Sequence, residues 1–128
     1  YLVTADELKE QQINTQFGKK YNLKMNCFVN GKLISEGNAK DMNWTFAEII
    51  ERASYGVEIF PGDVIGSGTV GSGCLLEING AKKRDNPNYS EIWLKNGDEI
   101  EMQVEMLGKI KNKITASNSR HSILKLKK

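Results

Sequence analysis

The sequence predicts an α+β domain that is predominantly β, and three observations support this. Several short segments alternate apolar and polar side chains with the period of two that half-buried strands require. Turn sequences containing Asn-Gly or other glycines separate them. Only residues 45–54 show apolar side chains at helical spacing. The 128 residues, 39% hydrophobic and 27% charged, suffice for one folded domain.

The first elements are a strand and a hairpin. The chain starts without methionine, and Tyr1 to Ala5 read as the middle of a strand, so we expect a piece of a longer protein. Residues 23–29 carry an apolar side chain at nearly every second position and predict a strand. Asn30-Gly31 is the strongest short hairpin signal, so residues 32–34 should form the returning strand.

One short helix is predicted near residues 45–54. Thr45-Phe46-Ala47-Glu48 has the capping-box pattern that marks a helix start. Phe46, Ile49, Ile50 and Ala53 then fall on one helix face. Gly56 is a suitable C-terminal stop.

Glycine and proline dominate the next stretch, and its elements are shorter. In order, we expect a turn at 61–63 capped by Asp63, a buried strand starting at 64–65, a glycine-rich loop at 66–73, a strand at 74–78, a turn at 79–80 and an exposed loop at 81–91. Beyond it lie a turn at 94–98, a strand over 100–106 and a lysine-rich edge strand over 109–114. The alternation places Glu101 on the wet face of the 100–106 strand.

The glycine-rich loop permits two interpretations. Residues 66–71 match G-x-G-x-x-G, but a dinucleotide site needs a helix after the loop, and residues 74–78 look like a strand. We therefore reject nucleotide binding. The loop could still press its amides, with the hydroxyls of Ser67, Thr69 and Ser72, against a small anion. A glycine-rich turn without a ligand is equally consistent with these residues.

Composition excludes several other classes of function. Cys27, Cys74 and His121 are too few for a cysteine/histidine zinc site. Residues 109–128 carry seven basic residues and no acid, but the tail has no aromatic residue for base stacking, so we expect no nucleic-acid partner. No apolar run approaches the roughly 20 residues of a membrane span. With no secretory signal at the start, the expected compartment is the cytoplasm.

Taken in order, these motifs resemble the fumarylacetoacetate hydrolase family. The signature is Pro61-Gly62-Asp63 followed by Gly68-Thr69, and Asn30-Gly31 and Leu94 to Asp98 also match. The resemblance implies a mixed β-sandwich or roll of the family's C-terminal type over residues 1–114, followed by a basic tail over 115–128. It also implies a homodimer.

The family implies a chemistry as well. Members act on 2-oxo acids or β-diketo acids in enol form, by hydrolytic C–C cleavage, isomerisation or lyase reactions. They use a divalent metal, most often Mg²⁺, with Ca²⁺ or Mn²⁺ as alternatives. The metal carboxylates lie upstream of the matched region, so no metal ligand is expected in this chain. Glu99-x-Glu101 lies on the late strand and is not assigned that role.

Two residue roles carry over from the resemblance. Thr69, with Gly68 beside it, matches the substrate-binding threonine whose hydroxyl and amide meet the substrate carboxylate. Glu77, in Gly73-Cys74-Leu75-Leu76-Glu77, matches a catalytic glutamate that orients a general-base histidine. That histidine would come from the upstream part of the same protein. His121 lies outside the matched region.

The sequence also departs from one branch of the family. Acylpyruvate-type members usually have proline after Gly-Thr, whereas Val70 stands here. This favours a hydrolase proper or a 2-keto-3-deoxy sugar acid dehydratase or hydratase. A non-catalytic binding module that retains the fold is a further alternative. Because the metal carboxylates and the histidine are absent, we expect this fragment alone to be inactive.

Overall fold

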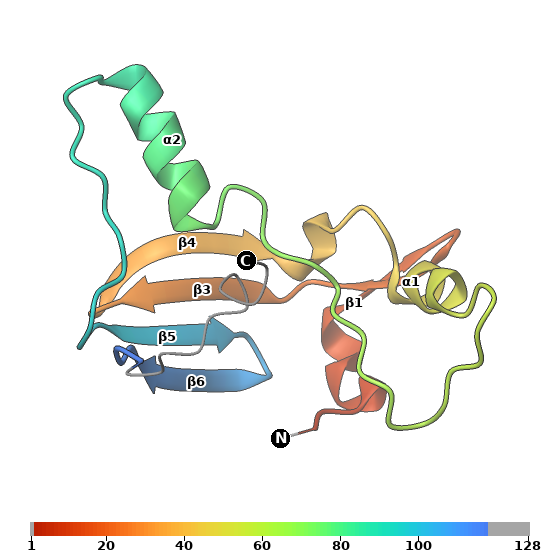
Figure 1. The fold of residues 1–128 in the computed structure, drawn as a ribbon. Helices are drawn as coiled ribbons and strands as arrows, with labels where there is room; N and C mark the ends of the chain where they lie inside the picture. The colour runs from red at the N-terminus through yellow and green to blue at the C-terminus, as the bar shows by residue number, and fades with distance from the viewer. Residues whose placement is uncertain (1, 118–128) are drawn as a thin grey trace, which may run out of the picture.

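The computed structural model describes residues 2–117 and confirms a mostly β, α+β fold (Figure 1). The elements are η1 (Ala5–Gln11), β1 (Gln12–Thr15), β2 (Gly18–Tyr21), β3 (Lys24–Val29), β4 (Lys32–Asn38), η2 (Ala39–Asp41), α1 (Phe46–Ala53), α2 (Leu75–Asp85), β5 (Glu99–Val104) and β6 (Gly108–Lys113). Within this part of the chain, no helix has the length and apolar character needed to cross a membrane. His121 and most of the basic tail lie outside the described residues.

Four antiparallel strands form the main sheet in the order β4-β3-β5-β6, and β1 and β2 form a separate hairpin. Cys27 of β3 lies opposite Ser35 of β4 and Met102 of β5, which fixes the register of the sheet. Asn30 and Gly31 both have positive φ, at 50° and 75°, as a two-residue hairpin turn requires. The predicted hairpin and the two late strands are confirmed, with ends shifted by a few residues.

The apolar face of this sheet is poorly covered. The register places Cys27, Met102 and Ile110 on neighbouring strands in one row across it. Met102 is 43% exposed and Ile110 is 58% exposed. Among the described residues, Leu8 and Leu23 are the only buried apolar side chains. A chain of this size normally buries many more, so this face is available to further polypeptide.

Helix α1 confirms the helix predicted over 45–54 and packs beside the β1–β2 hairpin. Thr45 is buried at its N-cap, and its Oγ1 lies 2.9 Å from the carbonyl oxygen of Phe17. The backbone amide and then the hydroxyl of Thr45 hydrogen-bond Glu48 and lower the pKa of that carboxyl. The Phe46 ring lies 5.9 Å from that of Tyr21, between ring centroids. The sequence-encoded cap thus fixes both the start and the position of this helix.

Several predicted elements are wrong. Ala5 begins the 3₁₀ helix η1, and no strand runs from Leu2 to Ala5. Residues 64–65 are exposed and form no strand. The strand at 74–78, the turn at 79–80 and the first half of the loop at 81–91 are replaced by helix α2. The turns at 61–63 and 94–98 are confirmed, and Asp63 Oδ2 accepts a 2.8 Å hydrogen bond from Phe60 N.

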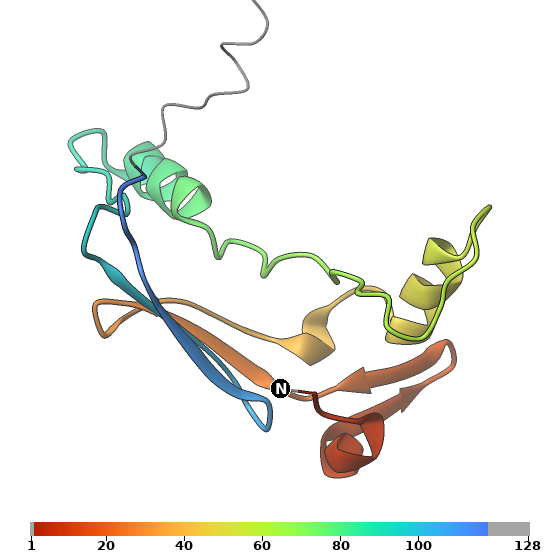
Figure 2. The same cartoon turned by 60° about the horizontal axis from the view of Figure 1, so that its bottom comes forward.

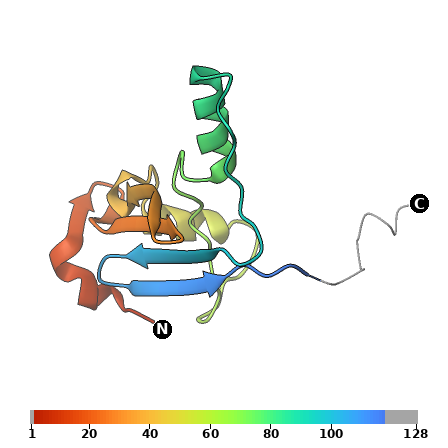
Figure 3. The same ribbon diagram turned by 90° about the vertical axis from the view of Figure 1, so that its left-hand side faces the viewer.

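Helix α2 forms because of local signals that a short apolar run hides. Cys74 Sγ accepts a 3.4 Å hydrogen bond from Glu77 N, so Cys74-x-x-Glu77 acts as a capping box with a thiol in place of a hydroxyl. Residues 81–84 are then strong helix formers. The helix stands away from the layer of strands (Figure 3), and it is held near its middle by Asn79. Asn79 is 2% exposed and exchanges two hydrogen bonds with the backbone of Ile92, at 2.8 and 3.0 Å.

Candidate functional site

A hollow of about 490 Å³ opens where the glycine-rich loop passes the end of β4. Figure 2 shows the connection from α1 to α2 running alongside β4 and η2 on one side of the sheet. The loop contributes one wall, and the β4–η2 corner with Met25 and Phe46 contributes the other. The lining residues are Met25, Glu36, Gly37, Asn38, Ala39, Asp41, Met42, Phe46, Ser67, Gly68, Thr69, Val70 and Gly71.

The two predicted substrate-binding residues both lie on this hollow. Gly68 and Thr69 are exposed loop residues within its lining. Gly68 has φ +96°, a conformation that a side chain would strain, so the glycine is needed for the path of the loop here. The geometry brings these residues to one site, and their contact with substrate stays a prediction.

Sequence reasoning missed most of the opposite wall. Asn38 shapes it, because its Oδ1 accepts a 3.1 Å hydrogen bond from Lys40 N and its Nδ2 donates one of 2.7 Å to Asn22 Oδ1. Glu36 and Asp41 place two carboxyl groups along the hollow, and Glu36 pairs with Lys24 at 3.6 Å. Within residues 2–117, no basic residue lines the hollow. This stretch mixes polar residues and small side chains after a strand, a composition that by itself indicates no binding site.

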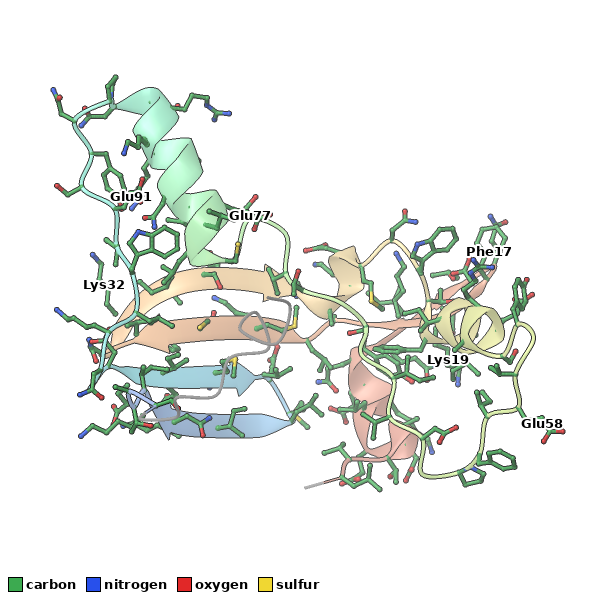
Figure 4. The ribbon with its side chains drawn as sticks, in the orientation of Figure 1. Phe17, Lys19, Lys32, Glu58, Glu77 and Glu91 are labelled. Carbon is green, nitrogen blue, oxygen red and sulfur yellow. The ribbon has the colours of Figure 1, made fainter. Side chains whose placement is uncertain are left out.

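The predicted catalytic glutamate lies apart from this hollow. Glu77 occupies the third residue of α2, at the base of the helix (Figure 4), and it is exposed. Its Oε2 accepts a 3.4 Å hydrogen bond from Cys74 N, which caps the helix. Its Oε1 accepts no hydrogen bond from residues 2–117, so one carboxylate oxygen remains available. The position on a helix corrects the predicted strand, and the catalytic role stays a prediction.

The glycine-rich loop does not form a nucleotide-binding unit, although the expected reason was wrong. A helix does follow the loop, where the sequence predicted a strand. However, no strand precedes it, because residues 54–73 contain none. The strand–loop–helix arrangement that presents a helix N-terminus to a pyrophosphate is therefore missing.

The described residues do not fit a metal site. Across residues 2–117, no group of three or more His, Cys, Asp and Glu side chains is placed to hold an ion. On β5, Glu99 pairs with Lys111 at 2.7 Å and Glu101 with Lys109 at 3.4 Å, so lysines occupy both carboxylates. Glu101 was expected to face water, yet its side chain is only 24% exposed.

Comparison with known proteins gives concordant results. The family model of the fumarylacetoacetate (FAA) hydrolase C-terminal domain matches residues 1–115. The human mitochondrial oxaloacetate tautomerase FAHD2A is 37% identical over 95 residues, which cover 73% of this chain and 26% of that protein. Oxaloacetate tautomerase YisK of Bacillus subtilis is 33% identical over 92 residues, which cover 72% of this chain and 27% of that protein.

A sugar acid enzyme is also similar. The 2,4-didehydro-3-deoxy-L-rhamnonate hydrolase of a Sphingomonas strain is 32% identical over 111 residues, covering 84% of this chain and 31% of the relative. The chain thus spans about a quarter to a third of the length of these curated relatives. All three relatives carry names of enzymes. The match of a single family model over residues 1–115 shows that this chain belongs to the fumarylacetoacetate hydrolase family.

Proposed function

We propose that this chain supplies the carboxylate-binding part of an enzyme that acts on a 2-oxo acid or β-diketo acid in its enol form. The observation that carries the proposal is the hollow between the glycine-rich loop and β4, with Thr69 and Gly68 in its lining. Its volume of about 490 Å³ accommodates a small dicarboxylic acid. Relatives named as oxaloacetate tautomerases support isomerisation, and the hydrolase relative supports bond cleavage.

Thr69 anchors the substrate in this proposal. Its hydroxyl and backbone amide donate hydrogen bonds to one substrate carboxylate, and the positive φ of Gly68 sets the path of the loop beside it. Glu36 and Asp41 repel an anion when ionised, and none of the described residues that line the hollow is basic. Positive charge must therefore come from the rest of the protein.

Enzymes of this family generally depend on a divalent metal. We expect Mg²⁺ here, with ligands contributed by the upstream part of the same protein, and a homodimer as the assembled form. Glu77 orients a general-base histidine from that upstream part through Oε1, which accepts no hydrogen bond from the described residues. On this proposal, residues 1–128 alone do not turn over substrate.

A second candidate keeps the same site but changes the substrate. The sugar acid hydrolase relative covers more of this chain than the tautomerases do, at 84% against 73%. A 2-keto-3-deoxy sugar acid carries the same 2-oxo carboxylate head, which Thr69 would hold in the same way. The two candidates therefore differ in the part of the hollow that meets the remainder of the substrate.

The test follows the ultraviolet absorbance of enolic oxaloacetate with the full-length protein and Mg²⁺. We expect loss of absorbance that Thr69→Ala and Glu77→Ala both slow. Thr115→Ala and Glu58→Ala are matched controls, because both residues are exposed and lie outside the hollow (Glu58, Figure 4). If the Glu77→Ala protein consumes enolic oxaloacetate as fast as the wild type, the proposed reaction stands but Glu77 has no catalytic role in it. No loss with oxaloacetate, but conversion of a 2-keto-3-deoxy sugar acid, would select the second candidate.

A further inference from the structure

The glycine-rich loop is not held against the sheet by hydrogen bonds from the described residues, so its position depends on side-chain packing. Within the described part of the chain, no hydrogen bond joins residues 64–72 to another element. The turn Gly73 N to Val70 O, at 3.2 Å, closes the loop only on itself. Every residue from Phe60 to Ser72 is exposed except Val70, which is half-buried. Among residues 60–72, Val70 is therefore where the connection meets the rest of the described domain.

Val70 meets the sheet at Gly37 of β4. A Cβ built on Gly37 would lie 2.7 Å from Val70 Cγ1 and 3.5 Å from Cγ2, so the valine side chain occupies the space of the missing side chain. Gly73 closes the other side, because a Cβ there would lie 2.9 Å from Val70 O and 3.3 Å from Val70 Cβ. Gly37 and Gly73 thus leave space on two sides for the branched side chain of Val70, and we call this space the seat of Val70.

We infer that Val70 anchors the substrate-binding loop by seating on the bare backbone of Gly37, which makes Gly37 a positioning residue for Thr69. Val70 directly follows Thr69, so a shift of one moves the other. The rotation of valine about χ1 is restricted, and a methyl group at Gly37 would have to move the loop backbone rather than only the side chain. The substrate part of this inference rests on the proposed function, whereas the anchoring does not.

The test compares three variants of the full-length protein. Gly37→Ala blocks the space that the Val70 side chain occupies. In Gly37→Ala/Val70→Ala the contact is kept with its two sides exchanged, because the new methyl at residue 37 fills the space of the two Cγ atoms that alanine at residue 70 lacks. Gly66→Ala is the matched control: it lies in the same loop outside the hollow, its φ is not positive, and its Cβ would meet nothing within 4 Å. Steady-state kinetics with oxaloacetate and amide hydrogen exchange at residues 68–73 are measured for each.

We expect Gly37→Ala to raise KM about tenfold with a much smaller change in kcat, because the displaced threonine weakens carboxylate binding. Exchange at the Gly73 amide should rise in the same variant while the β3 and β5 amides keep their protection. In the double variant, KM should fall most of the way back to the wild-type value. Gly66→Ala should have the KM and the loop exchange of the wild type. A merely structural role would raise exchange across the sheet and leave KM unchanged.

Unchanged KM and unchanged loop exchange in Gly37→Ala would overturn the inference, as would a double variant no better than the single one. A wild-type protein that fails to convert oxaloacetate would reject the proposed function instead. In that case the exchange comparison still decides whether Gly37 anchors the loop.

Discussion

Asn30 Nδ2 donates a 3.0 Å hydrogen bond to Asp98 Oδ1, which ties the β3–β4 turn to the turn before β5 across 68 residues of sequence. Asn30 Oδ1 accepts a 2.9 Å hydrogen bond from Glu99 N, and Lys95 N donates one of 2.8 Å to Asp98 Oδ2. The carboxylate of Asp98 therefore ties the end of the long excursion that carries the candidate site to the β3–β4 turn.

This link should make stability depend on pH in acid. The Asn30 side chain, and then the Lys95 amide, lower the pKa of Asp98 because they donate to its ionised form. The stabilisation is therefore complete above the ordinary aspartate pKa of about 3.9 and is lost as pH falls through the lower pKa of the folded state. In urea denaturation, Asp98→Asn should have a lower free energy of unfolding than the wild type at about pH 7. This difference in free energy should narrow as the pH falls below about 4. Asp85→Asn, at an exposed site, serves as control. A difference in stability between wild type and Asp98→Asn that does not narrow at all as the pH falls below about 4 would contradict the explanation.

Asn79 should be the residue on which the position of α2 depends. Asn79→Ala leaves the N–H and C=O of Ile92 without their partner, which destabilises a buried site by about 1–3 kcal/mol. Urea denaturation measures the loss, and hydrogen exchange should speed up at the Ile92 amide in particular. Asn88→Ala, an exposed asparagine beyond the helix, should leave both quantities near wild type. An Asn79→Ala protein of wild-type stability would show that the helix is held by other contacts.

The open apolar face of the sheet should bind hydrophobic dyes and promote self-association in the isolated residues 1–128. In the full-length protein we expect the dye signal to fall, because further polypeptide covers this face. Ile110→Lys in the isolated chain should lower dye binding without lowering stability, since Ile110 is more than half exposed. Lys109→Ala, in the same strand but out of the Ile110 row, is the control. Equal dye binding by both lengths of protein would contradict coverage by the remaining chain.

The sequence predicted the elements whose signals are local and redundant. For α1, the Thr45 cap, the apolar face and the Gly56 stop all agree, and the helix is found where they place it. For the β3–β4 hairpin, alternation and Asn30-Gly31 agree in the same way. Helix α2 was missed because five residues with four apolar side chains fit a strand as well as a buried helix, and a cysteine is an unusual N-cap.

The candidate site was only half predictable for a different reason. Thr69 and Gly68 belong to a contiguous motif, so the chain itself places them together. The facing wall comes from β4 and η2, about 30 residues earlier in the chain, and only tertiary structure brings Glu36 and Asp41 opposite the loop. The seat of Val70 on Gly37 is likewise invisible in sequence, because nothing local distinguishes a glycine that receives a side chain from one that makes a turn.

The strand order of the main sheet has a consequence for how this domain can diversify. Strands β4 and β5 both pair with β3, so residues 39–98 leave the sheet and return to it without contributing a strand. Doubling the length of such a flexible connection changes the free energy of loop closure by only about 0.6 kcal/mol. Insertions in its exposed parts, such as residues 86–88, should therefore change the stability of the four-stranded sheet little. Evolution can remodel the chemistry carried by this excursion while the four strands remain the same.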